Sequence, residues 1–329
     1  MRFIADFHLH SKYSRATSKE MEVESLARWA KRKGIGLIGT GDFTHPTYLT
    51  ELRAKLEPLG NGLLRVKKGD GKVQFILTAE ISNIYSQGGK VRRIHNLIFA
   101  PSFEVVQTIA SKLGNLGKLS SDGRPIFGFS AKDLLKMVMD ISADCMVIPA
   151  HAWTPWFSIF GANSGFDSIE ECYGEMAPHI HAIETGLSSD PEMNWRLSAL
   201  DRITLISNSD AHSPDRLGRE ANAFDCELDY GEIVDTLRTK DRKRFLFTLE
   251  FFPEEGKYHY DGHRQCGVVL SPAETKDHHC LCPKCHKKLT VGVMHRVDDL
   301  SDRPAGFLPR NAIPSIHLIP LEEIHQAID

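Results

Sequence analysis

Residues 3–10 read FIADFHLH and combine a short apolar run with two histidines. The run at 3–7 predicts a β-strand, and His8 and His10 follow it directly. Because alternate residues of an extended backbone point to the same side, both imidazoles can reach one metal ion. The stretch therefore predicts a metal site just beyond the carboxyl end of a strand.

Similar units recur through the first 250 residues, where short apolar runs alternate with amphipathic stretches. Further strands are predicted at 37–40, 75–79, 96–99, 146–150, 182–183 and 204–207. Helices are predicted at 23–33, 103–113, 131–141 and 232–237. Alternation of this kind predicts an α/β fold with a mostly parallel sheet, and in an α/β barrel the active site lies at the carboxyl ends of the strands.

Metal-binding residue types cluster at those strand ends. They are Asp42, Glu80, His151, Glu184, Asp210 and His212. His95 instead precedes its apolar run, which predicts a hairpin end or a bent strand there. Glu80 and Asp210 are the leading candidates for a carboxylate that bridges two ions, with His95 and His151 as nitrogen ligands of the second. Two bridged ions about 3.5–4 Å apart activate water and neutralise the oxygens of a phosphate ester, so the set predicts phosphoester hydrolysis. For Asp42 or Glu184 taken singly, a helix cap or a backbone contact is an equal alternative.

A second group of ligand types lies in the last quarter of the chain. Cys282 and Cys285 form a C-x-x-C knuckle, and His263 and Cys266 form an H-x-x-C knuckle before it. Two knuckles separated by about 15 residues match the spacing of structural zinc sites. The predicted zinc ligands are His263, Cys266, Cys282 and Cys285, with Cys280 as an alternative to Cys282 and His259 as an alternative to His263.

Charge, cysteine count and apolar content limit the class of protein, and the residue pattern divides the chain into domains. The 329 residues carry 40 Lys and Arg against 43 Asp and Glu, a net charge of −3, so no chain-wide positive field points to a polyanion. The odd count of seven cysteines argues against a disulfide framework. No apolar run is long enough to span a membrane, and the start of the chain lacks the apolar core of a signal peptide, so we expect a cytoplasmic protein. We predict a catalytic barrel at 1–250 and a zinc-binding segment with a tail at 251–329, ending in a short helix at 321–328.

The ligand motifs resemble, in order and context, those of the polymerase and histidinol phosphatase (PHP) superfamily. The resemblance rests on the HLH motif, Gly41-Asp42, Glu80, His95, His151 and Asp210-Ala211-His212. It implies a distorted seven-stranded α/β barrel that holds up to three metals. By the resemblance, His8, His10, Glu80 and Asp210 hold one divalent ion, and Glu80, His95 and His151 hold a second, as Mg²⁺, Mn²⁺ or Zn²⁺. At the third site the chain departs from the pattern, since Ser14 or Arg15 and Phe43 replace usual ligands, His45 is displaced and His212 remains.

A PHP barrel followed directly by a zinc segment resembles the endonuclease Q family. The resembling stretches are 8–21, 41–45, 256–266, 282–297 and 302–304. Members of that family are DNA-repair nucleases that cut 5′ to hypoxanthine, uracil and abasic sites and leave 3′-hydroxyl and 5′-phosphate ends. The resemblance implies a metal-dependent DNA endonuclease whose zinc segment contributes to DNA binding. We expect a monomer, with a sliding clamp as a candidate partner.

Substrate-binding residues are assigned more loosely. The stretch AWTPWFSIFG at 152–161 places Trp153 and Trp156 behind a ligand histidine, which suits stacking of an extruded base, with buried packing as an equal alternative. Arg15 and His212 are further candidates. The basic runs at 238–244 and 284–288 suit phosphate contact or a solvated surface. Two other functions stay open: a small-molecule phosphoesterase of the histidinol phosphatase type, and a non-catalytic DNA-binding module.

Overall fold

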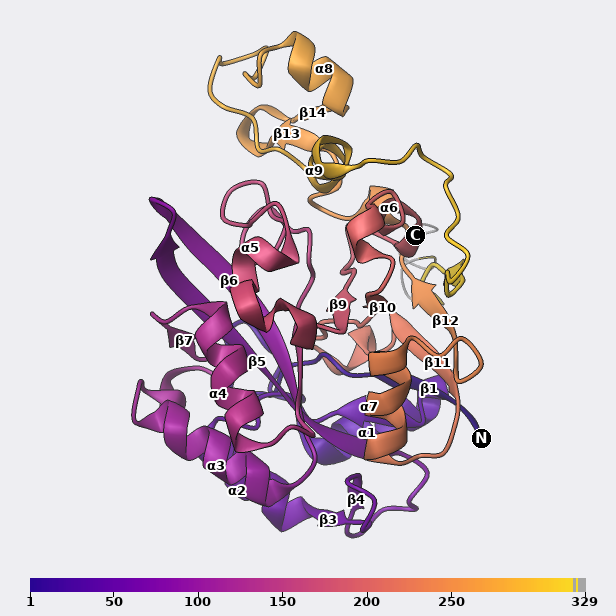
Figure 1. Ribbon diagram of the computed structural model, residues 1–329. Helices are drawn as coiled ribbons and strands as arrows, with labels where there is room; N and C mark the ends of the chain where they lie inside the picture. Colours follow the sequence, from indigo (N-terminus) through magenta and orange to yellow (C-terminus); the bar gives the residue numbers. More distant parts are fainter. Residues whose placement is uncertain (322–323, 325–329) are drawn as a thin grey trace.

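The strands predicted around the metal-type residues all form, and they surround the centre of a distorted α/β barrel (Figure 1). The computed structural model describes residues 1–321 and 324, so the helix predicted at 321–328 lies largely outside the described residues. The barrel strands are β1 (Arg2–Asp6), β2 (Leu37–Gly39), β5 (Gln74–Gln87), β6 (Lys90–Ala100), β8 (Met146–Pro149), β9 (Ala182–Glu184) and β10 (Thr204–Ile206).

The pairing is parallel on one side of the barrel and mixed on the other. β1, β2 and β5 pair in parallel, β6 runs antiparallel to both β5 and β8, and β9 and β10 form a separate parallel pair. The side chain of Asn208, just after β10, accepts a hydrogen bond from the backbone of Phe7 at 2.9 Å, which joins this pair to the end of β1. The fold class predicted from the sequence is confirmed, although the wall is not an evenly paired ring of parallel strands.

Three further strands extend the sheet beyond β1. β11 (Ala221–Asp225) pairs antiparallel with β1, and β12 (Phe245–Glu250) pairs antiparallel with β11. β15 (Ser315–His317) pairs in parallel with β12, so the chain returns to the barrel sheet after the C-terminal module. The short strands β3 (Leu56–Pro58), β4 (Leu64–Val66) and β7 (Ile126–Phe127) lie along β5 and its neighbours.

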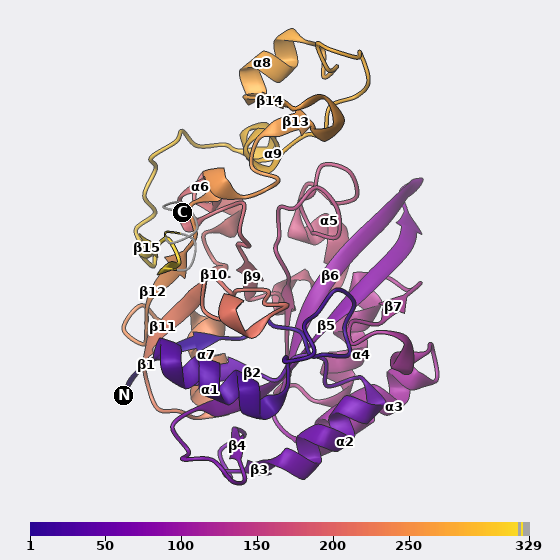
Figure 2. The same ribbon diagram turned by 180° about the vertical axis from the view of Figure 1, so that it is seen from behind.

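Helices cover the outside of the barrel (Figure 2). They are α1 (Val23–Lys33), α2 (Pro46–Lys55), α3 (Phe103–Gly114), α4 (Ala131–Ile141), α5 (Ile169–Tyr173), α6 (Pro191–Asn194) and α7 (Tyr230–Thr239). In α1 the apolar residues Val23, Leu26 and Ala30 recur at helical spacing and are buried, while Gly34 ends the helix in the left-handed conformation at φ 74°. Strand side chains that point inward, such as Phe7, form a second apolar cluster that fills the barrel below its mouth.

The module at the C-terminal side lies above the mouth of the barrel (Figure 1). It consists of the hairpin β13 (Asp261–His263) and β14 (Val268–Leu270) and the helices α8 (Pro272–Asp277) and α9 (Val293–Leu300). α9 attaches it to the barrel, because Val293 and Val297 are buried in the main core and Arg296 donates hydrogen bonds to the carbonyls of Phe160 and Phe166 at 2.9 and 3.1 Å. Among the described residues, no helix is long and apolar enough to cross a membrane.

Candidate metal centre

The first group of ligand atoms comes from the ends of β1 and β10. The Nε2 atom of His10 lies 3.2 Å from Oδ1 of Asp210, and the Nε2 atom of His8 lies 3.7 Å from the same oxygen. Both imidazoles are fully buried. As the alternate spacing predicts, the two rings reach the same place, and all three ligand atoms lie within 4.8 Å of one another.

The second group consists of Glu80, His95 and His151, whose ligand atoms also lie within 4.8 Å of one another. Oε1 of Glu80 is 2.7 Å from Nδ1 of His95 and 3.0 Å from Nε2 of His151. His95 lies opposite Ser82 in the antiparallel ladder of β5 and β6. Because β6 runs against its neighbours, a residue before its apolar end reaches the barrel mouth, which explains its unusual position in the sequence.

Glu80 connects the two groups. Its Oε1 faces His95 and His151, whereas its Oε2 lies 3.3 Å from Nε2 of His10 and 3.7 Å from Nε2 of His8. A carboxylate with one oxygen toward each group has the arrangement that a bridging ligand of two ions requires. Of the two bridging candidates from the sequence, Glu80 is the one placed between both groups.

Buried polar atoms without partners indicate that the site fits metal ions. Nε2 of His8, Nε2 of His10 and Oδ1 of Asp210 are buried and have no hydrogen-bond partner among the described residues. Burying such atoms unpaired costs about 1–3 kcal/mol each. A cation bound by these three atoms satisfies all of them, so the donor set fits a divalent ion.

Asp42 and Glu184 hold the ligand histidines in place. Nδ1 of His8 donates to Oε2 of Glu184 at 2.9 Å, and Nδ1 of His10 donates to Oδ1 of Asp42 at 3.1 Å. A proton held on Nδ1 leaves the Nε2 lone pair of each ring free for a metal. Glu184 also accepts a hydrogen bond from the backbone of His151 at 2.9 Å, so it touches both ligand groups. Asp42 likewise accepts from the backbone N–H of Ser11 at 2.6 Å, so both acids make the backbone contact that was the alternative interpretation and also orient a ligand histidine.

The electrostatics of the centre favour positive charge. Burial by itself lowers the pKa of His8, but the carboxylates of Glu184 and Glu80 outweigh it and hold that pKa well above its usual value. For His10 burial is likewise outweighed, first by Asp42. Burial by itself raises the pKa of Glu80, yet His95 and Arg124 outweigh it and hold that pKa well below normal. By contrast, burial lowers the pKa of His95 to about 4. The centre therefore attracts cations, either protons or metal ions.

The backbone is strained at three of these residues. The φ values are 44° at Asp42, 30° at His151 and 47° at Asp210, in a region of backbone conformation that residues other than glycine rarely adopt. Each follows a strand, so the strain turns its side chain toward the barrel mouth. Next to His151, Gly186 leaves no room for a side chain, because a Cβ there would lie 2.7 Å from the Cβ of His151. Strain of this kind is typical of functional sites.

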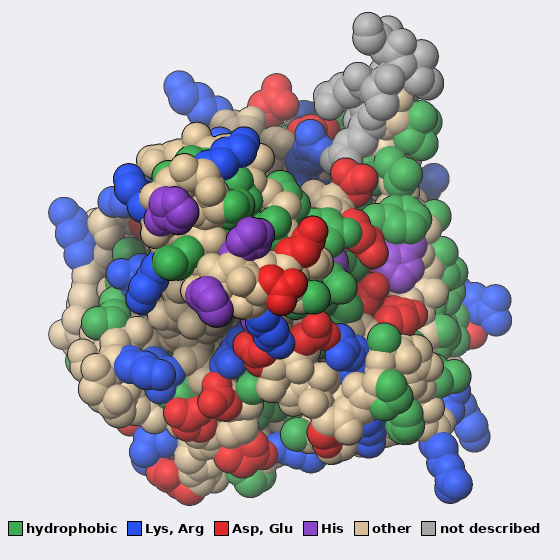
Figure 3. Space-filling model, turned by 90° about the horizontal axis from the view of Figure 1, so that it is seen from above, with side chains coloured by type: hydrophobic (Ala, Val, Ile, Leu, Met, Phe, Trp, Pro, Cys, Tyr) green, Lys and Arg blue, Asp and Glu red, His purple; other side chains and the backbone are tan. Residues whose placement is uncertain are grey.

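A cavity of about 890 Å³ opens from the centre toward the C-terminal module. His95, His151 and Asp210 form part of its wall, and Trp156, Phe157 and Tyr258 form an aromatic side. The rings of Trp156 and Tyr258 are 6.3 Å apart, which joins the barrel to the start of the module. Cationic side chains complete the wall: Arg93, Arg124, Arg219 and Lys257. Seen from above, this face carries basic, acidic and histidine side chains interspersed, with no single basic patch (Figure 3).

The structure corrects the stacking role predicted for Trp153. Its side chain is 1% exposed, its ring packs 4.7 Å from that of Phe160, and its Nε1 donates to Asn194 at 2.7 Å. The indole is therefore part of the core, which was the alternative interpretation, and only Trp156 of the pair lines the cavity.

The other substrate candidates lie near the rim. Arg15 is largely exposed and forms an ion pair with Asp122 at 3.2 Å, away from the cavity wall. His212 lies with its ring 4.6 Å from the ring of His10, and its Nδ1 donates to the carbonyl of Asp210 at 2.9 Å. Sequence reasoning missed Arg124, whose guanidinium contacts Glu80 at 3.0 Å, because an isolated arginine carries no motif.

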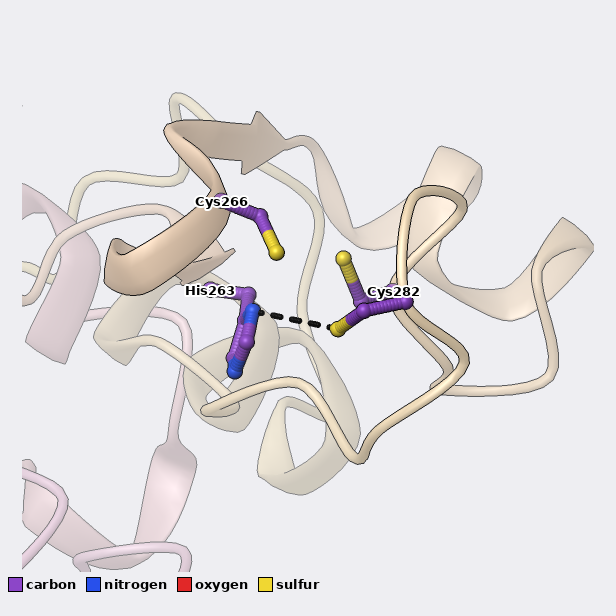
Figure 4. Close-up of side chains that lie close together, drawn as sticks. His263, Cys266 and Cys282 are labelled. Atoms are coloured by element: carbon purple, nitrogen blue, oxygen red, sulfur yellow. Dashed lines mark hydrogen bonds between the residues drawn. The ribbon is translucent and has the colours of Figure 1, made fainter.

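The C-terminal module contains a separate cluster of ligand atoms. His263, Cys266, Cys282 and Cys285 offer atoms that all lie within 4.8 Å of one another. The sulfur of Cys285 is 3.5 Å from Nδ1 of His263, and the labelled side chains point toward a common centre (Figure 4). One nitrogen and three sulfurs suit a closed tetrahedral metal site.

The alternatives for this cluster lie elsewhere. Cys280 is exposed and outside the group, whereas Cys282 is fully buried within it. His259 is buried against the barrel, where its Nδ1 bonds the carbonyl of Ser188 at 3.2 Å. The geometry therefore favours His263 and Cys282 over both alternatives.

A distorted α/β barrel with a carboxylate between two groups of ligands has the arrangement of a metal-dependent phosphoesterase. Profiles of known protein families give no match to the chain. The structure is similar to the lesion-specific endonuclease Q of Pyrococcus furiosus, with a TM-score of 0.86 and 32% identity, covering 100% of this chain and 78% of that one. It is equally similar, with a TM-score of 0.86 and 33% identity over 98% of this chain and 78% of that one, to endonuclease Q bound to a 27-mer duplex with an abasic lesion at its active site. The chain therefore belongs to the endonuclease Q family and is a metal-dependent endodeoxyribonuclease.

A similar sequence occurs in Bacillus subtilis. The protein YqxK of that organism, which has no assigned function, is 29% identical over 304 residues, covering 90% of this chain and 74% of that protein. The likeness therefore extends over the barrel and most of the remaining chain.

Proposed function

We propose that the protein is a DNA-repair endonuclease that hydrolyses the phosphodiester 5′ to deaminated bases, namely hypoxanthine and uracil, and to abasic sites. Its products would carry 3′-hydroxyl and 5′-phosphate ends. The observation that carries the proposal is the similarity over the whole chain to two endonuclease Q structures, one of which holds an abasic lesion at its active site. The ligand groups of this chain lie at the base of a cavity that is open to such a substrate.

Two divalent ions fit the barrel. His8, His10, Asp210 and Oε2 of Glu80 would hold one, and Oε1 of Glu80, His95 and His151 would hold the other. Bound there, Mg²⁺, Mn²⁺ or Zn²⁺ would supply Lewis acidity and make a water acidic enough to attack phosphorus at neutral pH. Asp42 and Glu184 keep the imidazoles oriented while the phosphate is bound.

The aromatic side of the cavity supports recognition of a flipped nucleotide. Trp156, Phe157 and Tyr258 form this side next to the metal centre. Stacking of a base on an aromatic ring contributes about 1–3 kcal/mol and tolerates different bases. Nucleotides with weakened pairing are the least costly to extrude, which suits lesions over intact DNA.

The Cys/His cluster of the module would hold a structural zinc ion. Three thiolates and an imidazole are ligands that zinc prefers, and the module supplies Tyr258 and Lys257 to the cavity wall through the segment that leads into it. The module would thus shape one side of the DNA-binding surface. A monomeric state, a cytoplasmic location and a sliding-clamp partner remain predictions.

The test is an incubation of purified protein with Mn²⁺ or Mg²⁺ and a duplex that carries one hypoxanthine on a labelled strand. We expect a single cut 5′ to the lesion, with a ligatable 3′-hydroxyl, and no cut in the matched duplex with guanine at that position. Intact strands together with rapid hydrolysis of a small phosphomonoester would contradict the proposal and favour a histidinol phosphatase type of activity.

A further inference from the structure

Arg124 lies at the point where the metal centre meets the cavity. It precedes β7 and lines the cavity wall together with His95, His151 and Asp210. Its Nη1 donates to Oε2 of Glu80 at 3.0 Å, the oxygen that faces His8 and His10. We propose that Arg124 is a catalytic residue that binds a non-bridging oxygen of the scissile phosphate. The proposal rests on the proposed function and adds a residue to it.

The guanidinium of Arg124 has hydrogen-bond donors that no protein acceptor uses among the described residues. It offers five N–H donors in a fixed plane, and one of them is used by Glu80. Among the described residues, no protein acceptor bonds its Nε or Nη2, and its side chain is 27% exposed. Since Arg124 lines the cavity and its side chain is partly exposed, its unused donors can reach a phosphate that enters the cavity. Arginine suits this role because its planar fork matches two phosphate oxygens.

The backbone around Arg124 is fixed relative to the metal centre. The N–H of Arg124 donates to Oδ1 of Asp122 at 3.1 Å, and the N–H of Gly123 donates to the carbonyl of Tyr13 at 3.0 Å. A Cβ on Gly123 would lie 2.3 Å from Oδ2 of Asp42, so only glycine lets this segment approach the carboxylate that orients His10. The loop therefore sets the position of Arg124 against the ligands without relying on its side chain.

The other cations of the cavity have different partners. The guanidinium of Arg93 lies 5.7 Å from the ring of Phe157, and Lys257 lies 5.0 Å from the ring of Tyr258. Nε of Arg219 donates to the carbonyl of Ser209 at 2.9 Å. Of these four cavity-lining cations, Arg124 is the one bonded to the carboxylate between the two ligand groups. Its place beside Glu80 suits contact with the reacting phosphate, whereas the other three suit neighbouring phosphates.

The chemistry requires such a donor. Attack of a water oxygen on phosphorus forms one P–O bond and breaks the bond to the 3′ oxygen, which takes a proton to become the 3′-hydroxyl while the 5′-phosphate stays on the lesion side. Negative charge on the non-bridging oxygens increases as the new bond forms. A preorganised cation stabilises that charge, and removing one such donor typically slows a reaction by about 10²–10³-fold. Arg124 keeps its own proton throughout.

The test combines Arg124→Gln with a neutral phosphate. Two duplexes with the same single lesion carry, 5′ to it, either a native phosphate or a methylphosphonate, and binding is measured by fluorescence anisotropy in Ca²⁺ on strands verified as intact. We expect the wild-type protein to prefer the native phosphate, and Arg124→Gln to reduce that preference by about tenfold, because the charge-assisted hydrogen bond is gone while the barrel ions remain. Metal content measured by mass spectrometry should stay unchanged, and single-turnover cleavage should slow by about 100-fold. Arg93→Gln is the matched comparison, and it should weaken both duplexes equally.

Several outcomes would overturn the inference. An Arg124→Gln protein that prefers the native phosphate as strongly as the wild type would do so. Loss of barrel metal in that variant would do so too, since Arg124 would then only position Glu80. A wild-type protein that binds lesion DNA without distinguishing the two phosphates would also exclude the contact. Failure of the wild-type protein to bind lesion DNA at all would instead overturn the proposed function itself.

Discussion

The barrel metal centre and the Cys/His cluster of the module differ in what holds their ligands in place. The barrel ligands come from positions between His8 and Asp210, and strands packed around a large apolar core carry them. The cluster ligands come from within residues 263–285, and their cysteines belong to or pack against a small apolar group of Val268, Cys282 and Leu289. A large packed core can hold a site open without its ion, whereas a unit with so small an apolar group depends on the ion to fold. On the proposed function, the same chain would use metals once for chemistry and once for structure.

Changing Asp210 to alanine tests the first half of this contrast and should have the largest effect. It removes a carboxylate from the group that would hold one barrel ion. We expect cleavage of lesion DNA to fall by about 10³-fold or more. Folding, DNA binding and the metal of the module should persist, as measured by circular dichroism, anisotropy and metal analysis. The exposed Asp140 on α4 provides the matched control, Asp140→Ala, and unchanged cleavage in Asp210→Ala would refute the site.

Changing Cys282 to serine tests the second half. Cys282 is fully buried at the centre of the cluster, so its loss should release one metal ion per chain and unfold the module. Hydrogen exchange should become fast across residues 261–290, while α9 and the barrel strands stay protected. The exposed Cys280 provides the control, because Cys280→Ser should retain the metal. A barrel that unfolds together with the module would break the contrast.

The acids behind the ligands offer a finer test. Asp42→Asn and Glu184→Gln preserve size but remove the charge that keeps the proton on Nδ1 of His10 and His8. Loss of such a partner typically costs 10–100-fold in metal affinity or activity. We expect that range in metal titrations followed by cleavage, and no change for the exposed Glu175→Gln. Equal metal affinity in wild type and both variants would show that packing alone orients the rings.

The smallest effect concerns the stability of the barrel itself. Burial, reinforced by the nearby Asp190 and Glu192, raises the pKa of Glu250 to about 8. The folded state therefore binds more protons than the unfolded state between about pH 4.5 and 8, so stability falls as pH rises through this window. Glu250→Gln should match the wild type at pH 5 and melt at a higher temperature than the wild type at pH 9, because only the wild type then has to ionise a buried carboxyl. Thermal melts at the two pH values check this, with Glu254→Gln as an exposed control. A variant that is less stable at pH 9 would contradict the pKa direction.

Much of the barrel could be predicted because its signals are local. Short apolar runs that alternate with segments of helical periodicity predict each strand that carries a ligand. Helices α1 and α4 begin and end at the predicted residues. β11, β12 and β15 were not predicted, since their pairing depends on partners far along the chain. α2 was also missed, because its start depends on a cap by the side chain of His45, a residue considered only as a displaced ligand.

The ligands of the site could be predicted, but several of their neighbours could not. Ligand residues at strand ends can be recognised from their spacing in the sequence. The position of Arg124 next to Glu80 instead depends on the folding of its loop against Asp42. The basic run at 238–244 is conspicuous in the sequence, but its cations are paired within the protein. Arg244 in that run pairs with Glu232, Asp235 and Asp241, and Lys240 donates to the carbonyl of Asp201 at 2.9 Å. Charge density along a sequence therefore does not indicate which cations are available to a ligand.

The pairing of β15 with β12 anchors the module at both ends. The chain leaves the barrel sheet at Glu250 and rejoins it at Ser315. The module is therefore inserted between two strands of the same sheet and is connected to it at both ends. The returning segment is fastened on the way, where Arg303 contacts both carboxylate oxygens of Asp201 at 2.7 and 2.6 Å. A doubly anchored element samples far fewer orientations than one on a single tether. A single proteolytic cut between α9 and Arg303 would therefore separate the module from both fastenings of the returning segment, while leaving every ligand of the metal centre intact.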